Sequence, residues 1–289
     1  MAAGGAGTSR AVWRRIGAVP TDVIRRNNVT VRGNGDQPML FAHGFGCDQN
    51  MWRFLTPAFE DDYRVVLFDY AGHGKSDRAA YDPDRYRSLD GFAQDILDVV
   101  HELDLRNLVL VAHSVSAMIG VLAINREPDR FDRLVMVSPS PRYINDPPDY
   151  RGGFEQADIE GLLDMMDKNY IGWAGTLTPI IMKNDQRPEL TAELNESFCS
   201  TDPVVARQFA KVTFLSDNRD DLPHLPVPSI VLQVTDDAIA PRGVGEYVAR
   251  VTPNSTFREL EATGHCPHMS HPDETIAAIR EYLSGAPAA

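Results

Sequence analysis

The sequence predicts an α/β fold in which a mostly parallel, twisted sheet is flanked by helices. Runs that are apolar throughout alternate with segments whose apolar residues recur at helical spacing. Strands buried on both faces of a parallel sheet show this pattern. The alternation stops over residues 142–217, where four helical segments and no good strand follow one another. We therefore expect one core, residues 23–141 and 218–284, interrupted by a helical insertion.

The elements of this core follow in chain order. Short strands and turns are expected first, then longer apolar runs separated by helices. The expected strands are Val29–Val31, Pro38–Ala42, Arg64–Asp69, the run from Leu108 to the residue before Ser114, Arg133–Val137, Ser229–Thr235 and Thr256–Leu260. One core helix is expected to begin at Ser88, and a second to run from Ser114 to about Asn125. A third is expected over Val244–Val251. In the last helix, Ile276, Ile279 and Leu283 share one face.

The insertion carries more Phe, Met and Trp than a helical excursion facing solvent should expose. Its expected helices are Ile159–Tyr170, Trp173–Met182, Glu189–Phe198 and Val204–Leu215. This apolar surface must be buried against another part of the chain. We expect the insertion to form a lid over the sheet. Residues 1–22 and 285–289 lack a clear period and are expected to be mobile tails.

Composition excludes several classes of protein. The net charge of −13 and the pI of about 5.0 disfavour nucleic acids and anionic membrane surfaces as partners. No apolar run is long enough to cross a bilayer, and the arginines near the start lack the apolar run of a signal peptide. The three cysteines are far apart and odd in number, which indicates a reducing, cytoplasmic location.

Ser114 is the first candidate catalytic residue. It stands between a buried strand and the small residues that open a helix, which is the setting of a nucleophile elbow. The usual pattern Gly-x-Ser-x-Gly is not met, because Ala112 and Ser116 occupy the glycine positions. Both substitutes are small, as a crowded turn requires. A helix N-cap is the alternative interpretation of this serine.

A base and an acid for Ser114 follow two later strands. A serine hydroxyl is a weak nucleophile, which needs a base to take its proton and an acid to orient that base. Asp236 and Asp237 come after one strand, and His265 comes after the next. The chain order Ser, Asp, His is that of the α/β-hydrolase fold. We therefore expect a catalytic triad at the carboxyl edge of the sheet.

A loop for the oxyanion follows an early strand. The segment His43-Gly-Phe-Gly46 has glycines that let its backbone approach a substrate closely. Acyl transfer needs two backbone N–H groups aimed at the oxygen that becomes negative. We expect the amides of Phe45 and Val115 to be these donors. A glycine-rich turn without chemistry is the alternative.

Several further segments carry a specific resemblance. They are His43–Trp52, Leu67–Tyr70, Leu89–Asp95, His113–Met118, Asn169–Ala174, Ser200–Pro203, Arg207–Ala210 and Gly264–Glu274. Through them the span from Val29 to Leu283 resembles the RsbQ-like branch of the α/β-hydrolase superfamily, which includes the plant strigolactone and karrikin receptors. The lid motif around Trp173 makes the chain look closer to the bacterial branch than to the plant receptors.

The resemblance implies further assignments. It makes Ser116 a normal residue for the elbow, and it favours Asp237 over Asp236, because Gln233, Asp237 and Pro241 match a family pattern. It implies a V-shaped lid of four helices over residues 142–217, above a deep apolar pocket, in a monomer without a cofactor. The residues matching its substrate pocket are His113, Tyr143, Phe154, Trp173, Leu177 and Phe214, with Phe45 beside them.

Other motifs favour structural interpretations. His265, His268 and His271 recur every third residue, but one belongs to the expected triad and no acidic or thiol ligand is convincingly placed, so we expect no metal. Gly72-His-Gly74 lacks the residues of a phosphate-binding loop and is expected to be a turn. Cys47 and Cys266 flank the expected site, and we interpret them as buried, inert thiols rather than redox groups.

The sequence therefore predicts a serine hydrolase that acts on a small hydrophobic ester or lactone. One alternative is a ligand-gated signalling protein, since the resemblance implies a stress-response regulator with a PAS-domain phosphatase as partner. In that case turnover would be secondary to the protein contact. A weaker alternative is a C–C bond hydrolase or a cofactor-free perhydrolase, which share the fold and the triad.

Overall fold

A computed structural model describes residues 22–285. Seven strands form one sheet in the order β1-β3-β2-β4-β5-β6-β7. All neighbouring strands are parallel except β1, which runs antiparallel to β3. The strands are β1 Thr30–Arg32, β2 Gln37–Ala42, β3 Tyr63–Leu67, β4 Leu108–His113, β5 Phe131–Val137, β6 Ser229–Asp236 and β7 Ser255–Thr263. The expected mostly parallel sheet is confirmed.

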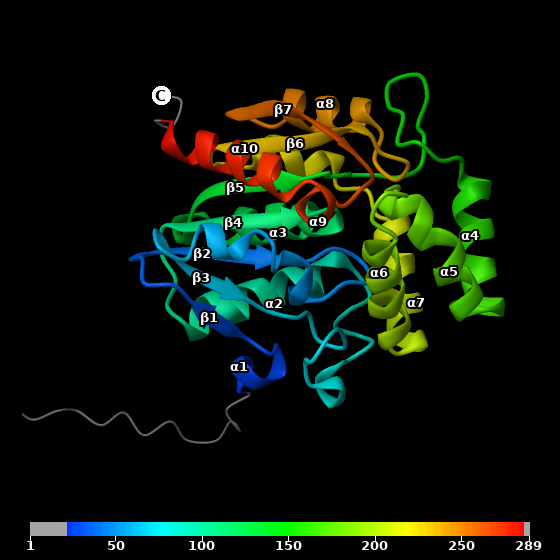
Figure 1. Cartoon of the computed structure of the whole chain (residues 1–289), viewed down its shortest axis with the longest axis horizontal. Coiled ribbons are helices and arrows are strands. Elements are labelled where there is room, and N and C mark those ends of the chain that lie inside the picture. The colour runs from blue at the N-terminus through cyan, green and yellow to red at the C-terminus, as the bar shows by residue number, and fades with distance from the viewer. Residues whose placement is uncertain (1–21, 286–289) are drawn as a thin grey trace, which may run out of the picture.

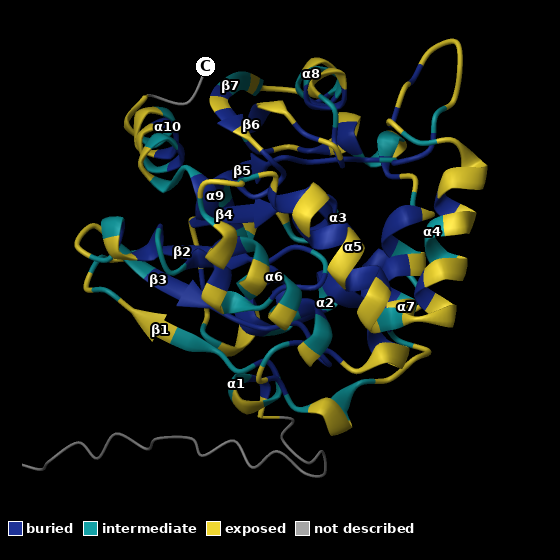
Figure 2. Cartoon of the chain, turned by 45° about the vertical axis from the view of Figure 1, so that its right-hand side comes forward, coloured by how far each residue is buried: buried dark blue, intermediate teal, exposed yellow. Residues whose placement is uncertain are grey.

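Helices cover both faces of this sheet. Side chains alternate along a strand, so that Met39 and Phe41 of β2 join one hydrophobic cluster while Leu40 and Ala42 join the other. The second cluster includes α2 Leu89–Glu102, α3 Val115–Arg126 and α8 Arg242–Val251. The first cluster includes α9 Pro267–Ser270 and α10 Pro272–Ser284. Figure 2 shows the central strands as largely buried and the edge strands β1 and β7 as more exposed.

Four α-helices and one 3₁₀-helix, Arg219–His224, lie between β5 and β6 in the chain. The four α-helices are α4 Gln156–Lys168, α5 Tyr170–Met182, α6 Pro188–Ser200 and α7 Pro203–Phe214. In Figure 1 they lie together beyond the carboxyl ends of the strands. Their inward side chains, including Trp173, Leu194 and Phe214, belong to the same hydrophobic cluster as β2 and β5. The outer face of α4 is exposed (Figure 2).

Two short α-helices, α1 and α9, were not expected. Helix α1 covers Val23–Arg26, and the Asp22 carboxylate accepts a hydrogen bond from the Arg25 amide at its start. Asp22 is therefore a helix cap, although we placed it in a mobile tail. The rest of that tail, residues 1–21, and residues 286–289 lie outside the described residues. Helix α9 begins with a proline directly after Cys266. None of the helices described is long and apolar enough to cross a membrane.

Candidate active site

Ser114 occupies a sharp turn between β4 and α3. Its backbone has φ 57° and ψ −127°, a region that residues other than glycine rarely adopt and that stores strain. The Ser114 amide donates to the carbonyl of Val137, at the end of the neighbouring strand β5. This bond holds the turn against the sheet. The strained turn therefore presents the Ser114 hydroxyl at the carboxyl edge of the sheet.

Ser116 replaces the second glycine of the usual elbow pattern and makes two hydrogen bonds. Its hydroxyl donates to the carbonyl of His43, where β2 enters the glycine loop. It also lies 2.9 Å from the buried Tyr70 hydroxyl. The hydroxyl of Ser116 therefore joins the elbow to the loop that carries Phe45. A glycine at this position could not make either bond.

His265 and Asp237 form a hydrogen-bonded chain with Ser114. The Ser114 hydroxyl lies 2.7 Å from Nε2 of His265, and Nδ1 of His265 lies 2.8 Å from Oδ2 of Asp237. All three side chains are buried. The amide of His265 donates to the carbonyl of Ile181 at the end of α5. The helical insertion therefore helps to position the histidine.

Gly264 makes the turn that delivers His265. It has φ +83°, and a Cβ at this position would lie 2.1 Å from the carbonyl oxygen of Met182. Both its conformation and its close approach to α5 therefore exclude a side chain. This contact connects the end of β7 to the end of α5.

Asp237 is the partner of the histidine, and Asp236 is not. Oδ1 of Asp237 accepts hydrogen bonds from the amides of Ile239 and Ala240 at 2.8 and 3.0 Å. Burial would raise the pKa of Asp237, but His265 and the two amides outweigh burial and lower it below its ordinary value. The carboxylate therefore stays negative. Asp236 is exposed and pairs with Lys183.

The glycine loop approaches Ser114 closely. A Cβ on Gly44 would lie 2.4 Å from Nδ1 of His113 and 3.4 Å from Cβ of Ser114. Among residues 22–285, no group accepts a hydrogen bond from the amides of Phe45 or Val115. The Val115 amide is one of the free N–H groups at the start of α3. Both amides therefore have unused donor capacity near the elbow.

A small cavity lies over Ser114, with a volume of about 30 Å³. Of the expected pocket residues, Phe45, His113, Tyr143, Leu177 and Phe214 line it. The cavity is also lined by seven residues that were not assigned to the pocket from the sequence, namely Cys47, Ile181, Leu194, Phe198, Thr213, Ile239 and Cys266.

Two expected pocket residues do not line this cavity. Trp173 is buried behind its wall, where its ring meets Phe45 edge-on and stacks on Tyr170 and Phe198. Phe154 belongs to the segment before α4, and its backbone pairs with Tyr143 and Asn145. Position in the sequence did not reveal which face of each segment turns towards Ser114.

One group of described residues has the composition of a metal site. The ligand atoms of His113, Cys266 and His268 lie within 4.8 Å of one another, and all three residues are buried. One ring nitrogen of His113, Nε2, lies 2.8 Å from the carbonyl oxygen of His265. The rings of His113 and His268 pack with centroids 4.4 Å apart. From the sequence we placed no thiol ligand beside His268, and the structure corrects this, because Cys266 lies beside both His113 and His268.

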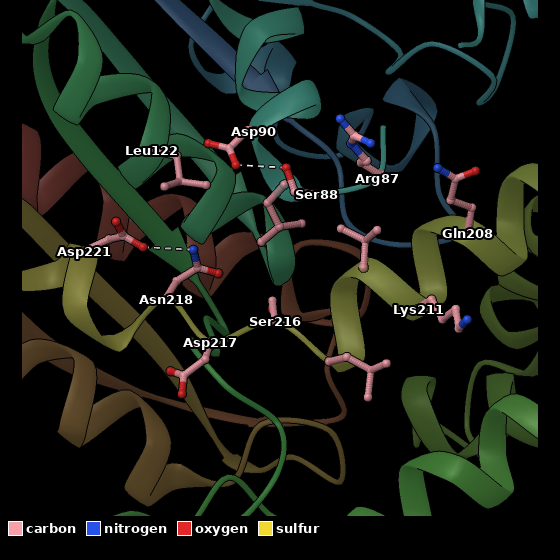
Figure 3. Close-up of a pocket in the computed structure, with 13 residues that line it drawn as sticks. Arg87, Ser88, Asp90, Leu122, Gln208, Lys211, Ser216, Asp217, Asn218 and Asp221 are labelled. Carbon is pink, nitrogen blue, oxygen red and sulfur yellow. Dashed lines mark hydrogen bonds between the residues drawn. The ribbon is translucent and has the colours of Figure 1, made fainter. Parts of the chain in front are cut away.

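A larger, open hollow lies between α2, α3 and α7 (Figure 3). Its volume is about 650 Å³, and it shares no lining residue with the cavity over Ser114. Its walls carry Arg87 and Lys211 as well as Asp90, Asp217 and Asp221. The hollow is therefore separate from the cavity over Ser114.

The sheet topology and the strand-end positions of these side chains define an α/β-hydrolase fold. A model described as the alpha/beta hydrolase family matches residues 39–278, and the chain belongs to this family. The family resemblance stated from the sequence is thereby confirmed.

Known proteins with similar sequences include plant receptors and esterases. The chain is 38% identical over 262 residues to Karrikin insensitive 2 receptor CA of Petunia hybrida, covering 90% of this chain and 97% of the relative. It is 35% identical over 263 residues to strigolactone esterase D14 of Arabidopsis thaliana, covering 91% and 98%. Among solved structures, a hydrolase from Oleispira antarctica has a TM-score of 0.90 and 44% identity, covering 92% of this chain and 97% of that one.

Proposed function

We propose that this protein is a serine hydrolase that acts on a small hydrophobic ester or lactone. The observation that carries the proposal is the buried hydrogen-bonded chain from the Ser114 hydroxyl through His265 to Asp237. Its parts follow three strand ends of an α/β-hydrolase fold. The esterase names of several relatives also support it.

The proposed reaction begins when Nε2 of His265 takes the proton of Ser114. The serine oxygen then attacks the carbonyl carbon, and the amides of Phe45 and Val115 stabilise the negative oxygen. Asp237 stabilises the imidazolium that forms. The imidazolium next gives its proton to the leaving oxygen. Water repeats the sequence on the acyl-enzyme, which releases the acid and restores the serine.

The cavity supports a small, apolar substrate. The helical insertion contributes five aromatic or aliphatic side chains to its wall, and these are Leu177, Ile181, Leu194, Phe198 and Phe214. A volume of about 30 Å³ has room for roughly two water molecules. An ester or lactone therefore needs the wall residues to shift outwards as it enters. We expect short acyl groups to be preferred over long ones.

Replacing the nucleophile tests the proposal. We expect Ser114→Ala to reduce hydrolysis of 4-nitrophenyl acetate to the background rate and to abolish labelling by a fluorophosphonate probe. Ser200→Ala, which removes an exposed hydroxyl, serves as the matched control and should retain both. Hydrolysis by Ser114→Ala at the wild-type rate would exclude the mechanism.

A second candidate is a ligand-gated signalling protein, favoured by the relatives that are named receptors. In this proposal the product or bound ligand changes a protein contact made by the helical insertion, with a signalling phosphatase as the partner. Capture experiments with wild-type protein and Ser114→Ala, each with and without ligand, test it. A partner retained only when the ligand is present supports signalling, and no partner in any arm argues against it.

A further inference from the structure

Thr213 carries an unpaired hydroxyl and is one of the residues that line the cavity over Ser114. It lies in α7, is 1% exposed, and lines the cavity together with the phenyl ring of Phe214. Within residues 22–285, its Oγ1 atom has no hydrogen-bond partner. The hydroxyl of Tyr143, which also lines the cavity, faces Ser114 instead. Thr213 is therefore a polar group of the wall that is not committed to the hydrogen-bonded chain.

A buried threonine in a helix usually satisfies its hydroxyl by donating to the carbonyl four residues earlier. The buried Thr178 of α5 does so, donating to the carbonyl of Ala174 at 3.0 Å, and the exposed Thr176 bonds in the same way to Gly172 at 2.9 Å. Thr213 does not make the equivalent bond to Phe209. Other buried hydroxyls without partners, such as those of Thr56 and Ser229, lie away from this cavity.

An unpaired hydroxyl in an apolar cavity is unfavourable unless a bound molecule supplies the missing partner. Sites built to hydrogen-bond one group of a substrate discriminate strongly against analogues without that group. An apolar wall alone discriminates weakly between molecules of similar shape. The hydroxyl of Thr213 therefore favours substrates that offer a hydrogen-bonding group as well as a suitable size.

We propose that Thr213 is a specificity-determining residue whose hydroxyl donates to a second oxygen of the substrate. Resting on the proposed function, this inference narrows the substrate class to small esters or lactones that carry an additional ether or carbonyl oxygen. Ser114 attacks the scissile carbonyl, and Thr213, in α7, binds the second oxygen. Because the cavity is small, that oxygen lies within a few atoms of the scissile carbonyl.

Three esters of equal chain length test the proposal. They are 4-nitrophenyl pentanoate, 4-nitrophenyl ethoxyacetate and 4-nitrophenyl 3-methoxypropanoate, which differ in whether and where an oxygen replaces a methylene. We expect Thr213→Val to lower kcat/KM about tenfold for at least one ether ester and less than threefold for pentanoate. Dividing each value by the wild-type value cancels the intrinsic reactivity of each ester.

Two further comparisons keep the test decisive. Thr178→Val removes a buried hydroxyl that is already paired, and it should leave the ratio between ether esters and pentanoate unchanged. Thr213→Ser and Thr213→Ala differ only in the hydroxyl, so they repeat the test if the valine variant does not fold. The serine variant should keep the ether preference and the alanine variant should lose it.

The outcomes separate this inference from the proposed function. If the Thr213 variants change all three esters equally, or change none, while Ser114→Ala is inactive, the role of Thr213 is wrong and the hydrolase mechanism stands. If Ser114→Ala still hydrolyses the esters at the wild-type rate, the mechanism itself is wrong. The role of Thr213 then falls with it.

Discussion

Asp237 keeps its charge in a buried position because three donors surround it. His265 occupies one oxygen and the amides of Ile239 and Ala240 occupy the other. A carboxylate that only accepts hydrogen bonds requires the proton of the neutral imidazole to be on Nδ1. The other ring nitrogen, Nε2, is then free to accept the proton of Ser114.

Asp237→Asn should therefore impair the proposed reaction without removing the side chain. An asparagine can donate its amide N–H to Nδ1 of His265, which favours the tautomer with the proton on Nε2. We expect kcat/KM for a short 4-nitrophenyl ester to fall by about 10⁴, as for the corresponding change in other triads. Asp236→Asn, at the exposed neighbour, is the control and should stay within about twofold. Equal effects of the two changes would contradict the assigned role of Asp237.

Ser116 and Tyr70 form a buried pair whose contribution can be separated. Ser116→Ala leaves the Tyr70 hydroxyl without its partner, so we expect the free energy of unfolding to fall by about 1–3 kcal/mol. In a Tyr70→Phe background the same change should cost less, because no tyrosine hydroxyl is left unpaired. Urea unfolding of the two single variants and the double variant measures the difference. Additive losses would show that the two hydroxyls do not interact.

The sheet was largely predictable because burial on both faces leaves a clear trace in the sequence. Every residue of β4 is buried, and its run is apolar as far as His113. The buried stretches of β2 and β6 are also mainly apolar. Helices α1 and α9 have four residues each, which is too short to show a helical period. They were therefore missed.

The candidate site was predictable only where it depends on the ends of strands. Ser114, Asp237 and His265 each follow a parallel strand, so their sequence positions determine the edge of the sheet at which they lie. Their catalytic roles stay proposals. Residues of the insertion differ, because the docking of each helix decides which face turns inwards. The sequence therefore did not distinguish Trp173, behind the wall, from Thr213, in it.

The glycine loop and α6 are fitted to each other, which gives a test at Gly46. Its φ is +70°, and a Cβ there would lie 2.1 Å from the ring of Phe198 in α6. Gly46→Ala must strain the loop and displace the ring, so we expect the free energy of unfolding to fall by about 1–3 kcal/mol. We also expect esterase activity to fall, because Phe198 lines the cavity and Phe45 precedes Gly46.

Gly161 provides the matched control. It lies in exposed α4, and a Cβ there would meet no atom within 4 Å. Gly161→Ala should therefore raise the free energy of unfolding by about 0.5–1 kcal/mol, because alanine favours the helix. Thermal or urea unfolding of both variants measures the two shifts. Shifts of the same sign would mean that the lack of space around Gly46 does not determine how Gly46→Ala changes the free energy of unfolding.

Three buried histidines make the stability of the whole molecule sensitive to acid. Burial lowers the pKa of His73 and of His268 to about 3, and it lowers the pKa of His113 well below its ordinary value. Neighbouring histidines contribute to each of these shifts. The folded chain therefore keeps these side chains neutral where the unfolded chain protonates them. Their contribution to stability is complete above about pH 6.5 and is lost as the pH falls below that value.

Replacing one of these histidines should flatten the dependence of stability on pH. His73→Gln removes a group that takes up a proton only on unfolding, and it keeps a donor for the carbonyl of Ala71. As the pH falls from about 6 to about 4, we expect the free energy of unfolding of the variant to rise, relative to that of the wild type, by about 1.4 kcal/mol per pH unit. Urea unfolding at several pH values measures this gain, and His224→Gln, at an exposed histidine, should leave the dependence unchanged. Parallel curves for His73→Gln and the wild type would show that His73 also takes up a proton in the folded state.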